Sequence, residues 1–289
     1  MTIVANYCIF LMANRLVFVK NLLKNVVLCD RMMDTQDRSK VFCKESKVVM
    51  RRFHLNVNQL KIVAIVAMTI DHAAAVFLPY GPLKLVLRCI GRLAAPIMCY
   101  MIAEGYHHTS NRWRYLLRLI LFALIAHIPF TLTMHDTLDP LKATSVMWSL
   151  AMGLLALMII KEEHIHPLLR MGGLGLCCLL AYTANWNYIA VLWVVFFGWY
   201  HGNKKMQILM FTLVGIVFHL GQQFMPLITG LRTVDNFMLW YQPGIFLAIP
   251  LLLCYDGSHG RKSKFLKHLF YWYYPFHLLL LYILKLLVK

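Results

Sequence analysis

Hydrophobic residues in this chain lie in long blocks that short polar segments separate. From about residue 59 onward, blocks of about 15–23 residues follow one another. Each block is long enough, or nearly so, to cross a hydrocarbon core of about 30 Å as a helix. Strands of a membrane barrel would alternate polar and apolar residues, and these blocks do not alternate. The pattern therefore predicts an all-α, polytopic transmembrane helical bundle of nine spans, at about residues 59–78, 84–105, 114–134, 143–161, 168–183, 187–201, 205–224, 236–255 and 265–287.

Basic residues occur in alternate connecting segments. The segment before the first span, and those after the second, fourth, sixth and eighth, carry Lys or Arg, whereas the segments between them hold hardly any. The positive-inside rule assigns the basic set to the cytoplasm. We therefore expect the N-terminus inside and the C-terminus outside.

Composition agrees with a membrane protein and excludes other classes. The chain is 60% hydrophobic and 14% charged, whereas soluble domains are about 45–50% apolar and about 25% charged. The net charge of +17 comes from residues at span ends and in the first 52 residues, without a phosphate loop or nucleic-acid motif, so we expect a lipid bilayer and no nucleic acid as partner. The eight cysteines show no Cys-x-x-Cys and no zinc spacing with histidine, so no metal site is expected.

The first 52 residues differ from the rest of the chain. Their apolar stretches are interrupted by Asn, Lys and Arg, as in an amphipathic helix at a membrane surface. Met50 then opens "MRRFHLNVNQLKIVAIV", which resembles a natural protein start. We interpret residues 1–52 as a basic, amphipathic extension. Our hypothesis is that translation naturally starts at Met50 and that residues 1–49 are an artefact of the assigned start site. Residues 53–289 form the predicted transmembrane domain.

Ionisable residues interrupt the spans at similar depths. Asp71 and His72 lie in the outer half of the first span. Arg92 is nearly level with Asp71 in the second span, and Arg88 lies one turn away on the same face. Each such group costs at least about 2.5–3.5 kcal/mol inside a membrane, so it normally faces a cavity or a partner. One polar chamber that opens outward would accommodate them all. Later spans add His127, His219 and His277 at comparable depth.

Simpler structural roles compete with a shared chamber. An intramembrane histidine such as His219 is more often a hydrogen-bond donor between helices than a catalyst. Arg88 or Arg92 would also serve as a structural counter-ion for Asp71. Glu104, at the cytoplasmic end of the second span, is expected to be an interfacial charge that pairs with Arg112 or Arg114, or else part of the site. The remaining histidines, which include His107, His108 and His201, fall in predicted loops and are interpreted as solvated.

Three motifs resemble the TraX family of polytopic membrane proteins. They are "LKIVAIVAMTIDHAA" at 60–74, "IGRLAAPIMCYMIAEGYHHTSNRWRYLLRL" at 90–119 and "YYPFHLLLLYIL" at 273–284. The resemblance covers about residues 55–287, and Asp71, His72, Arg92, Glu104 and His277 fall on motif positions. At the turn before the sixth span the family pattern implies an acid, where this chain has Asn185-Trp186-Asn187-Tyr188.

The resemblance implies an acetyltransferase of the bacterial cytoplasmic membrane, similar in kind to enzymes that modify the N-terminus of pilin subunits. Acetyl-CoA would be the donor, and the acceptor would be a pilin-like protein or a glycan. For this chemistry His72 is a suitable base, with Asp71 setting the charge of the site and His277 as a second base or acyl carrier. The remaining candidates for substrate binding are Arg88, Arg92, Glu104 and His127.

Two other functions use the same residue types. Buried Asp, His and Arg also build proton relays in small-solute transporters, although no internal repeat of the transporter kind is visible in this chain. A non-catalytic assembly factor with a purely structural chamber is the third hypothesis. Transfer of a labelled acetyl group, or counterflow of an unmodified solute, separates the three.

Overall fold

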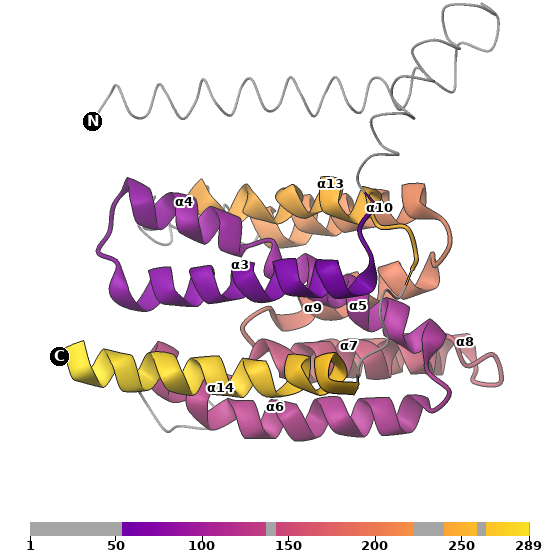
Figure 1. Ribbon diagram of the computed structural model, residues 1–289. Coiled ribbons are helices and arrows are strands. Elements are labelled where there is room, and N and C mark those ends of the chain that lie inside the picture. Colours follow the sequence, from indigo (N-terminus) through magenta and orange to yellow (C-terminus); the bar gives the residue numbers. More distant parts are fainter. Residues whose placement is uncertain (1–53, 137–142, 222–239, 259–263, 289) are drawn as a thin grey trace, which may run out of the picture. The chain divides into compact units, whose positions relative to one another are not determined.

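The computed structural model describes residues 54–136, 143–221, 240–258 and 264–288, with side chains from residue 270 onward in the last range. The extension predicted at 1–52 and the basic segment 261–263 lie outside these residues. The described residues from Leu55 onward belong to one compact unit. They form helices and no strand (Figure 1). The helices are α3 (Val57–Phe77), α4 (Pro82–Gly91), α5 (Ala94–His108), α6 (Arg112–His135), α7 (Val146–Ile160), α8 (Pro167–Leu180), α9 (Asn187–Trp199), α10 (Lys204–Val214), the π-helix η1 (Gly215–Leu220), the 3₁₀-helix η2 (Gln242–Leu247), α13 (Ala248–Leu253) and α14 (Lys264–Val288).

Short polar residues begin several of these helices. Asn56 accepts a hydrogen bond from the Gln59 backbone N–H, and the Gln59 side chain accepts one from Asn56 in return. Asn111 and Asn203 accept bonds in the same way at the starts of α6 and α10. Each cap satisfies an N–H that the first turn of a helix leaves without a partner. The starts of α3, α6 and α10 are thus encoded in the local sequence.

Four helical segments are long and apolar enough to cross a membrane. They are Val57–Phe77, Pro82–His108, Arg112–His135 and Phe270–Val288. Shorter apolar helices occupy Val146–Ile160, Pro167–Leu180, Asn187–Trp199 and Gln242–Leu253. The all-helical membrane architecture is therefore confirmed, while the number of nine spans and the orientation of the termini stay predictions.

The second predicted span is broken into α4 and α5. Arg92 and Leu93 form a turn between the two helices. Pro96 explains the break, because a proline has no N–H to donate to the carbonyl of Arg92, and its ring would collide with that carbonyl in a continuous helix. Arg92 therefore sits at the end of a short helix and not in the middle of a long one.

Helices α7 and α9 form the centre of the bundle. Trp193, Phe197, Leu150 and Leu154 are all fully buried, as expected for helices that are apolar on every side. At Gly198 the two helices approach so closely that an added Cβ would lie 2.3 Å from a methyl of Leu157. Small residues at such contacts are typical of packed membrane helices.

Helix α6 has one buried face and one apolar exposed face. Leu117, Leu121, Leu124 and Ile128 recur every three or four residues on the exposed face, each more than half exposed. Water would not solvate this stripe favourably, whereas lipid chains would. Figure 1 shows α6 beside α14, with α3 next to α14 and α4 next to α3. This order brings α3 between the second and the last predicted spans, where the candidate residues lie.

Candidate functional site

Asp71 on α3 binds Arg88 of α4 and Arg92 of the turn that follows α4. Arg88 Nη1 donates to Asp71 Oδ2 at 2.8 Å, and Arg92 Nη2 donates to Oδ2 at 2.9 Å and to Oδ1 at 3.2 Å. The contact between Asp71 and Arg92 that was expected from their equal depth is present, and Arg88 joins it. Asp71 and Arg92 are both 8% exposed. One carboxylate therefore faces two guanidinium groups, and a positive charge is left over.

Aromatic rings enclose the two guanidinium groups. The centre of the Tyr241 ring lies 4.8 Å from the guanidinium carbon of Arg88 and 5.1 Å from that of Arg92. The centre of the Trp186 ring lies 5.2 Å from the guanidinium carbon of Arg92. Arg88 also donates to the Tyr241 hydroxyl at 3.2 Å. The negative faces of the rings stabilise the cations in place of water. The buried Nε of Arg92 has no hydrogen-bond partner among the described residues, so one donor of this cluster is unsatisfied.

Helix α4 lies against α3 through a glycine. A Cβ added to Gly91 would lie 2.3 Å from the Asp71 Cβ and 2.5 Å from its Oδ1. Real Cβ atoms do not approach that closely, so any larger residue at this position would push Asp71 away from the arginines. In the motif Gly91-Arg92, the glycine allows the chain to approach Asp71 closely, and the arginine then forms an ion pair with Asp71.

His72, the next residue on α3, pairs with His277 of α14. His72 Nδ1 and His277 Nε2 are 2.9 Å apart, and the two rings are stacked with centroids 5.2 Å apart. Both residues are buried, at 6% and 3% exposure. Successive residues on a helix point about 100° apart, so Asp71 faces α4 while His72 faces α14. His72 is therefore not oriented by its neighbour Asp71.

The hydrogen bonds of His277 fix the tautomers of the neutral pair. His277 Nδ1 is 2.9 Å from the Tyr273 carbonyl oxygen, which only accepts, so Nδ1 carries the proton. Nε2 of His277 is then an acceptor and must receive its bond from Nδ1–H of His72. The lone pair of the His72 ring consequently lies on Nε2. A neutral imidazole with an available lone pair is a general base.

His219 and Gln242 form a second buried pair near the arginines. His219 Nε2 donates to Gln242 Oε1 at 3.0 Å, which is the hydrogen bond between helices that was expected for His219. Its ring stacks on Trp186 with centroids 5.1 Å apart. Trp186 also covers Arg92, so the hydrogen-bonded His219 and Gln242 support the aromatic ring that packs on this arginine. The π-helix that carries His219 is a form that often occurs at functional sites.

His127 does not join these groups. It lies half-buried on α6, and no hydrogen bond or ion pair links its imidazole to the two clusters within the described ranges. Its assignment to substrate binding stays a prediction without a structural contact behind it.

Glu104 belongs to a separate cluster at the end of α5. Its carboxylate lies 3.3 Å from His201 Nε2 and 3.9 Å from His108 Nδ1, and Tyr255 donates to it at 3.4 Å. The expected pairing with Arg112 or Arg114 is wrong, because Arg112 turns instead to the ring of Tyr106.

The interpretation of three histidines as solvated loop residues is corrected in part, because His108 and His201 are exposed and His201 does lie in a turn. His107 and His108 form the last turn of α5, and His201 lies in the turn after α9. His107 contacts the Gly198 carbonyl oxygen at 2.9 Å and stacks on His201 with centroids 3.9 Å apart. The rings are partly exposed, yet each has a defined protein contact, because α5 and α9 end side by side.

A cavity of about 280 Å³ opens beside the Glu104 cluster. Side chains of α3, α5, α6, α7 and α14 line it, among them Lys61, Glu104, His108 and Arg118. The Arg118 guanidinium lies 6.0 Å from the rings of Tyr115 and Tyr271, and its buried Nε has no hydrogen-bond partner in the described part of the chain. The cavity therefore offers cationic groups within an apolar wall. It lies at the predicted cytoplasmic end. Lys61, which lines it, precedes His72 by about 16 Å along the axis of α3.

Sequence reasoning missed several residues of these sites. Trp186, Tyr273 and Tyr255 were not candidates, because an aromatic residue in a membrane protein most often packs or faces the interface. Only their contacts with Arg92, His277 and Glu104 distinguish them.

Comparisons with known proteins agree with the motifs. A family model described as "TraX protein" matches residues 56–285. A relative from Dichelobacter nodosus, described as "Probable fimbrial assembly protein FimC, serogroup H1", is 30% identical over 244 residues, which is 80% of this chain and 96% of the relative. No solved structure matches the chain significantly.

Proposed function

Because the chain belongs to the TraX family, we propose that it is an integral membrane acyltransferase of the bacterial cytoplasmic membrane. It transfers an acetyl group from cytoplasmic acetyl-CoA to an acceptor that is embedded in the membrane or lies outside it. The acceptor is the N-terminus of a pilin-like subunit or a sugar. The observation that carries this proposal is the buried His72–His277 pair, whose tautomers leave a basic nitrogen on His72.

In this reaction His72 acts as the general base. Its Nε2 takes the proton from the acceptor amine or hydroxyl as that atom attacks the thioester carbonyl. The bond from the acceptor to the acetyl carbon forms, the C–S bond breaks, and the proton passes from Nε2 to the leaving thiolate, so that free CoA thiol is released. His277 accepts the Nδ1–H bond of His72 throughout and holds the ring in the reactive tautomer, a role that an acid plays in other catalytic groups.

The arginine cluster supplies the positive charge that the reaction needs. The attack places negative charge on the carbonyl oxygen, and preorganised donors in a site without water stabilise it strongly. Asp71 neutralises only one of its two guanidinium partners. Arg92 retains a buried donor without a partner among the described residues. We assign the oxyanion to this side of α3.

The cavity beside Glu104 suits the donor. Lys61 and Arg118 line it, and such cations bind the phosphates of a CoA molecule. From there the acyl arm would extend along α3 toward His72. In this arrangement the donor enters from the cytoplasm and the acceptor approaches from the opposite side.

Incubation of the purified chain with radiolabelled acetyl-CoA tests the proposal. We expect release of CoA thiol and transfer of label to a peptide with a pilin-like N-terminus or to a sugar acceptor. The His72→Asn variant should lose both signals while it remains folded in detergent. Unchanged activity in that variant would overturn the proposal.

A second function has one observation in its favour. The relative from Dichelobacter nodosus is described as a probable fimbrial assembly protein, and a non-catalytic assembly factor would fit that description. In that case the purified chain would bind a fimbrial subunit without consuming acetyl-CoA, and His72→Asn would not alter fimbriation.

A further inference from the structure

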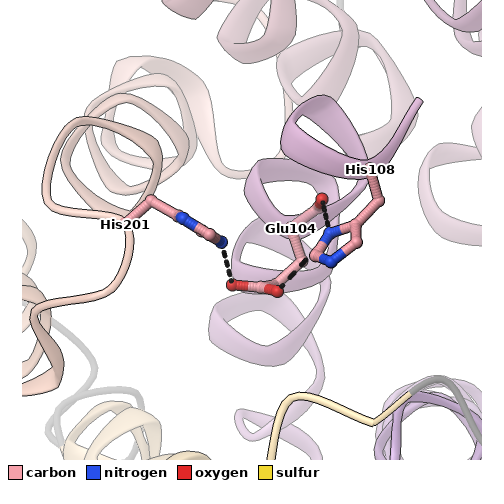
Figure 2. Close-up of side chains that lie close together, drawn as sticks. All are labelled: Glu104, His108 and His201. Atoms are coloured by element: carbon pink, nitrogen blue, oxygen red, sulfur yellow. Dashed lines mark hydrogen bonds and ion pairs between the residues drawn. The ribbon is translucent and has the colours of Figure 1, made fainter. Parts of the chain in front are cut away.

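Three metal-ligating side chains converge where α5 and α9 end. Glu104 and His108 lie four residues apart on one face of α5, and His201 comes from the turn after α9. Figure 2 shows the Glu104 carboxylate between the two imidazoles, with one oxygen turned toward each. One ligand atom from each residue lies within 4.8 Å of the other two.

These distances match the edges of a tetrahedral metal site. Zinc bonds to nitrogen and carboxylate oxygen are about 2.0–2.2 Å long, so two ligand atoms of one tetrahedral ion lie roughly 3.3–3.5 Å apart. His201 Nε2 and Glu104 Oε1 are 3.3 Å apart. The ligand atom that His108 offers lies within 4.8 Å of those of Glu104 and His201, so a side-chain adjustment of about 1 Å would close the site. Two histidines and one glutamate, with one position left open, form a known ligand set for zinc.

Neighbouring groups orient the ligands from outside. His108 Nδ1 is 2.9 Å from the backbone carbonyl oxygen of Glu104, so Nδ1 carries the proton and the lone pair lies on Nε2. A ring N–H that donates to a carbonyl is the usual outer contact of a metal-binding histidine. His107 stacks on His201 at 3.9 Å between centroids, and Tyr255 donates to Glu104. Each of the three ligands thus has a partner that fixes its direction.

We propose that Glu104, His108 and His201 bind a divalent transition-metal ion, zinc by its chemistry. Nitrogen and carboxylate donors without thiolates suit zinc, whereas magnesium and calcium prefer oxygen ligands. The ion fastens the end of α5 to the turn after α9. Glu104 and His108 also line the cavity, so the open coordination position is accessible from it. The ion would lie at the edge of the cavity assigned to the donor, but it takes no part in the transfer step proposed above.

Metal content measured on the full chain tests the site. The protein is purified without a histidine tag, treated with a chelator, and titrated with Zn²⁺ and, separately, Co²⁺. We expect one equivalent of tightly bound Zn²⁺, a visible absorption band of tetrahedral Co²⁺, and a higher unfolding temperature with Zn²⁺. The variants His201→Asn, His108→Asn and Glu104→Gln should each bind at least about tenfold more weakly and lose the Co²⁺ band.

The control variant is His164→Asn, which removes an exposed histidine from the turn between α7 and α8. It should bind Zn²⁺ as tightly as the unaltered chain. Less than one-tenth of an equivalent in the unaltered chain, or equal binding in His201→Asn, would mean that the three residues form only an ion pair. Both measurements are made without acetyl-CoA, so their outcome does not depend on the transferase.

Discussion

His72 and His277 lie 205 residues apart in the chain, and a hydrogen bond of 2.9 Å joins them inside the bundle. The Tyr273 carbonyl oxygen requires the proton of the neutral His277 ring to be on Nδ1. His277 Nε2 must then accept its hydrogen bond from Nδ1–H of His72. The reactive nitrogen of α3 is therefore determined by a backbone oxygen of α14.

The first prediction concerns this pair. His72→Asn should lower the rate of acetyl transfer by about 10²–10⁴-fold, the usual contribution of a general base. His277→Gln keeps an acceptor for the Nδ1–H of His72 and should lose much less, whereas His277→Leu should lose nearly as much as His72→Asn. Rates with saturating acetyl-CoA provide the measurement. His135→Asn, at the exposed end of α6, is the control and should keep full activity.

The second prediction concerns the charge balance around Asp71. Asp71→Asn leaves the buried Arg92 and the half-buried Arg88 without a carboxylate and should destabilise the protein by about 3–5 kcal/mol. Arg88→Gln leaves the neutral pair of Asp71 and Arg92 and should cost less. Unfolding of both variants in mixed micelles gives the comparison. If Arg88→Gln were the more harmful of the two, the charge balance described for this cluster would be wrong.

The third prediction concerns close packing between α4 and η2. A Cβ added to Gly244 would lie 2.2 Å from the backbone oxygen of Cys89, and a backbone atom cannot move aside as a flexible side chain can. Gly244→Ala should lower the unfolding temperature and reduce the yield of folded protein. Gly172→Ala, where nothing lies within 4 Å, should be neutral or should stabilise α8 by about 0.5–1 kcal/mol.

The fourth prediction concerns donor binding in the cavity. Arg118→Ala removes a cation that lines it and should raise the KM for acetyl-CoA about tenfold with a smaller change in kcat, because the phosphates are bound equally in ground and transition states. Arg114→Ala, one turn away and exposed, should leave KM unchanged. A fall in kcat alone would instead place Arg118 in the chemical step.

The fifth prediction concerns orientation in the membrane. Alternating basic segments predict a C-terminus outside the cytoplasm. Alkaline phosphatase fused after Lys289 should be active, and green fluorescent protein at the same point should be dark. Fusions to a chain truncated after Asn203, in a basic segment, should give the reverse pattern. Fluorescence from the full-length fusion would mean an even number of spans.

Periodicity and depth were sufficient to predict much of this fold. The described helices fall within or across all nine predicted blocks, because an apolar block in a membrane must satisfy its own backbone hydrogen bonds. The equal depth of Asp71 and Arg92 also predicted their contact correctly. The break at Arg92 was not predicted, although Pro96 in the sequence is its physical cause.

Direction around each helix axis was harder to predict than depth. Depth alone did not show that His72 faces His277 and that His127 stays apart, since rotation depends on packing with helices distant in the sequence. His201 was interpreted as solvated for a related reason. Its contact with Glu104 exists only because α5 and α9 end together, and no local spacing records that.

The turn at Arg92 and Leu93 divides one predicted span into two helices. On one side, α4 carries Arg88, ends at Arg92, and contacts α3 and η2. On the other, α5 is held against α9 and α7. The ten-residue α4 and the longer α5 of the same predicted span both pack against α3, and α5 also packs against α7 and α9 in the interior, so the arginine cluster is built on the peripheral half of this span.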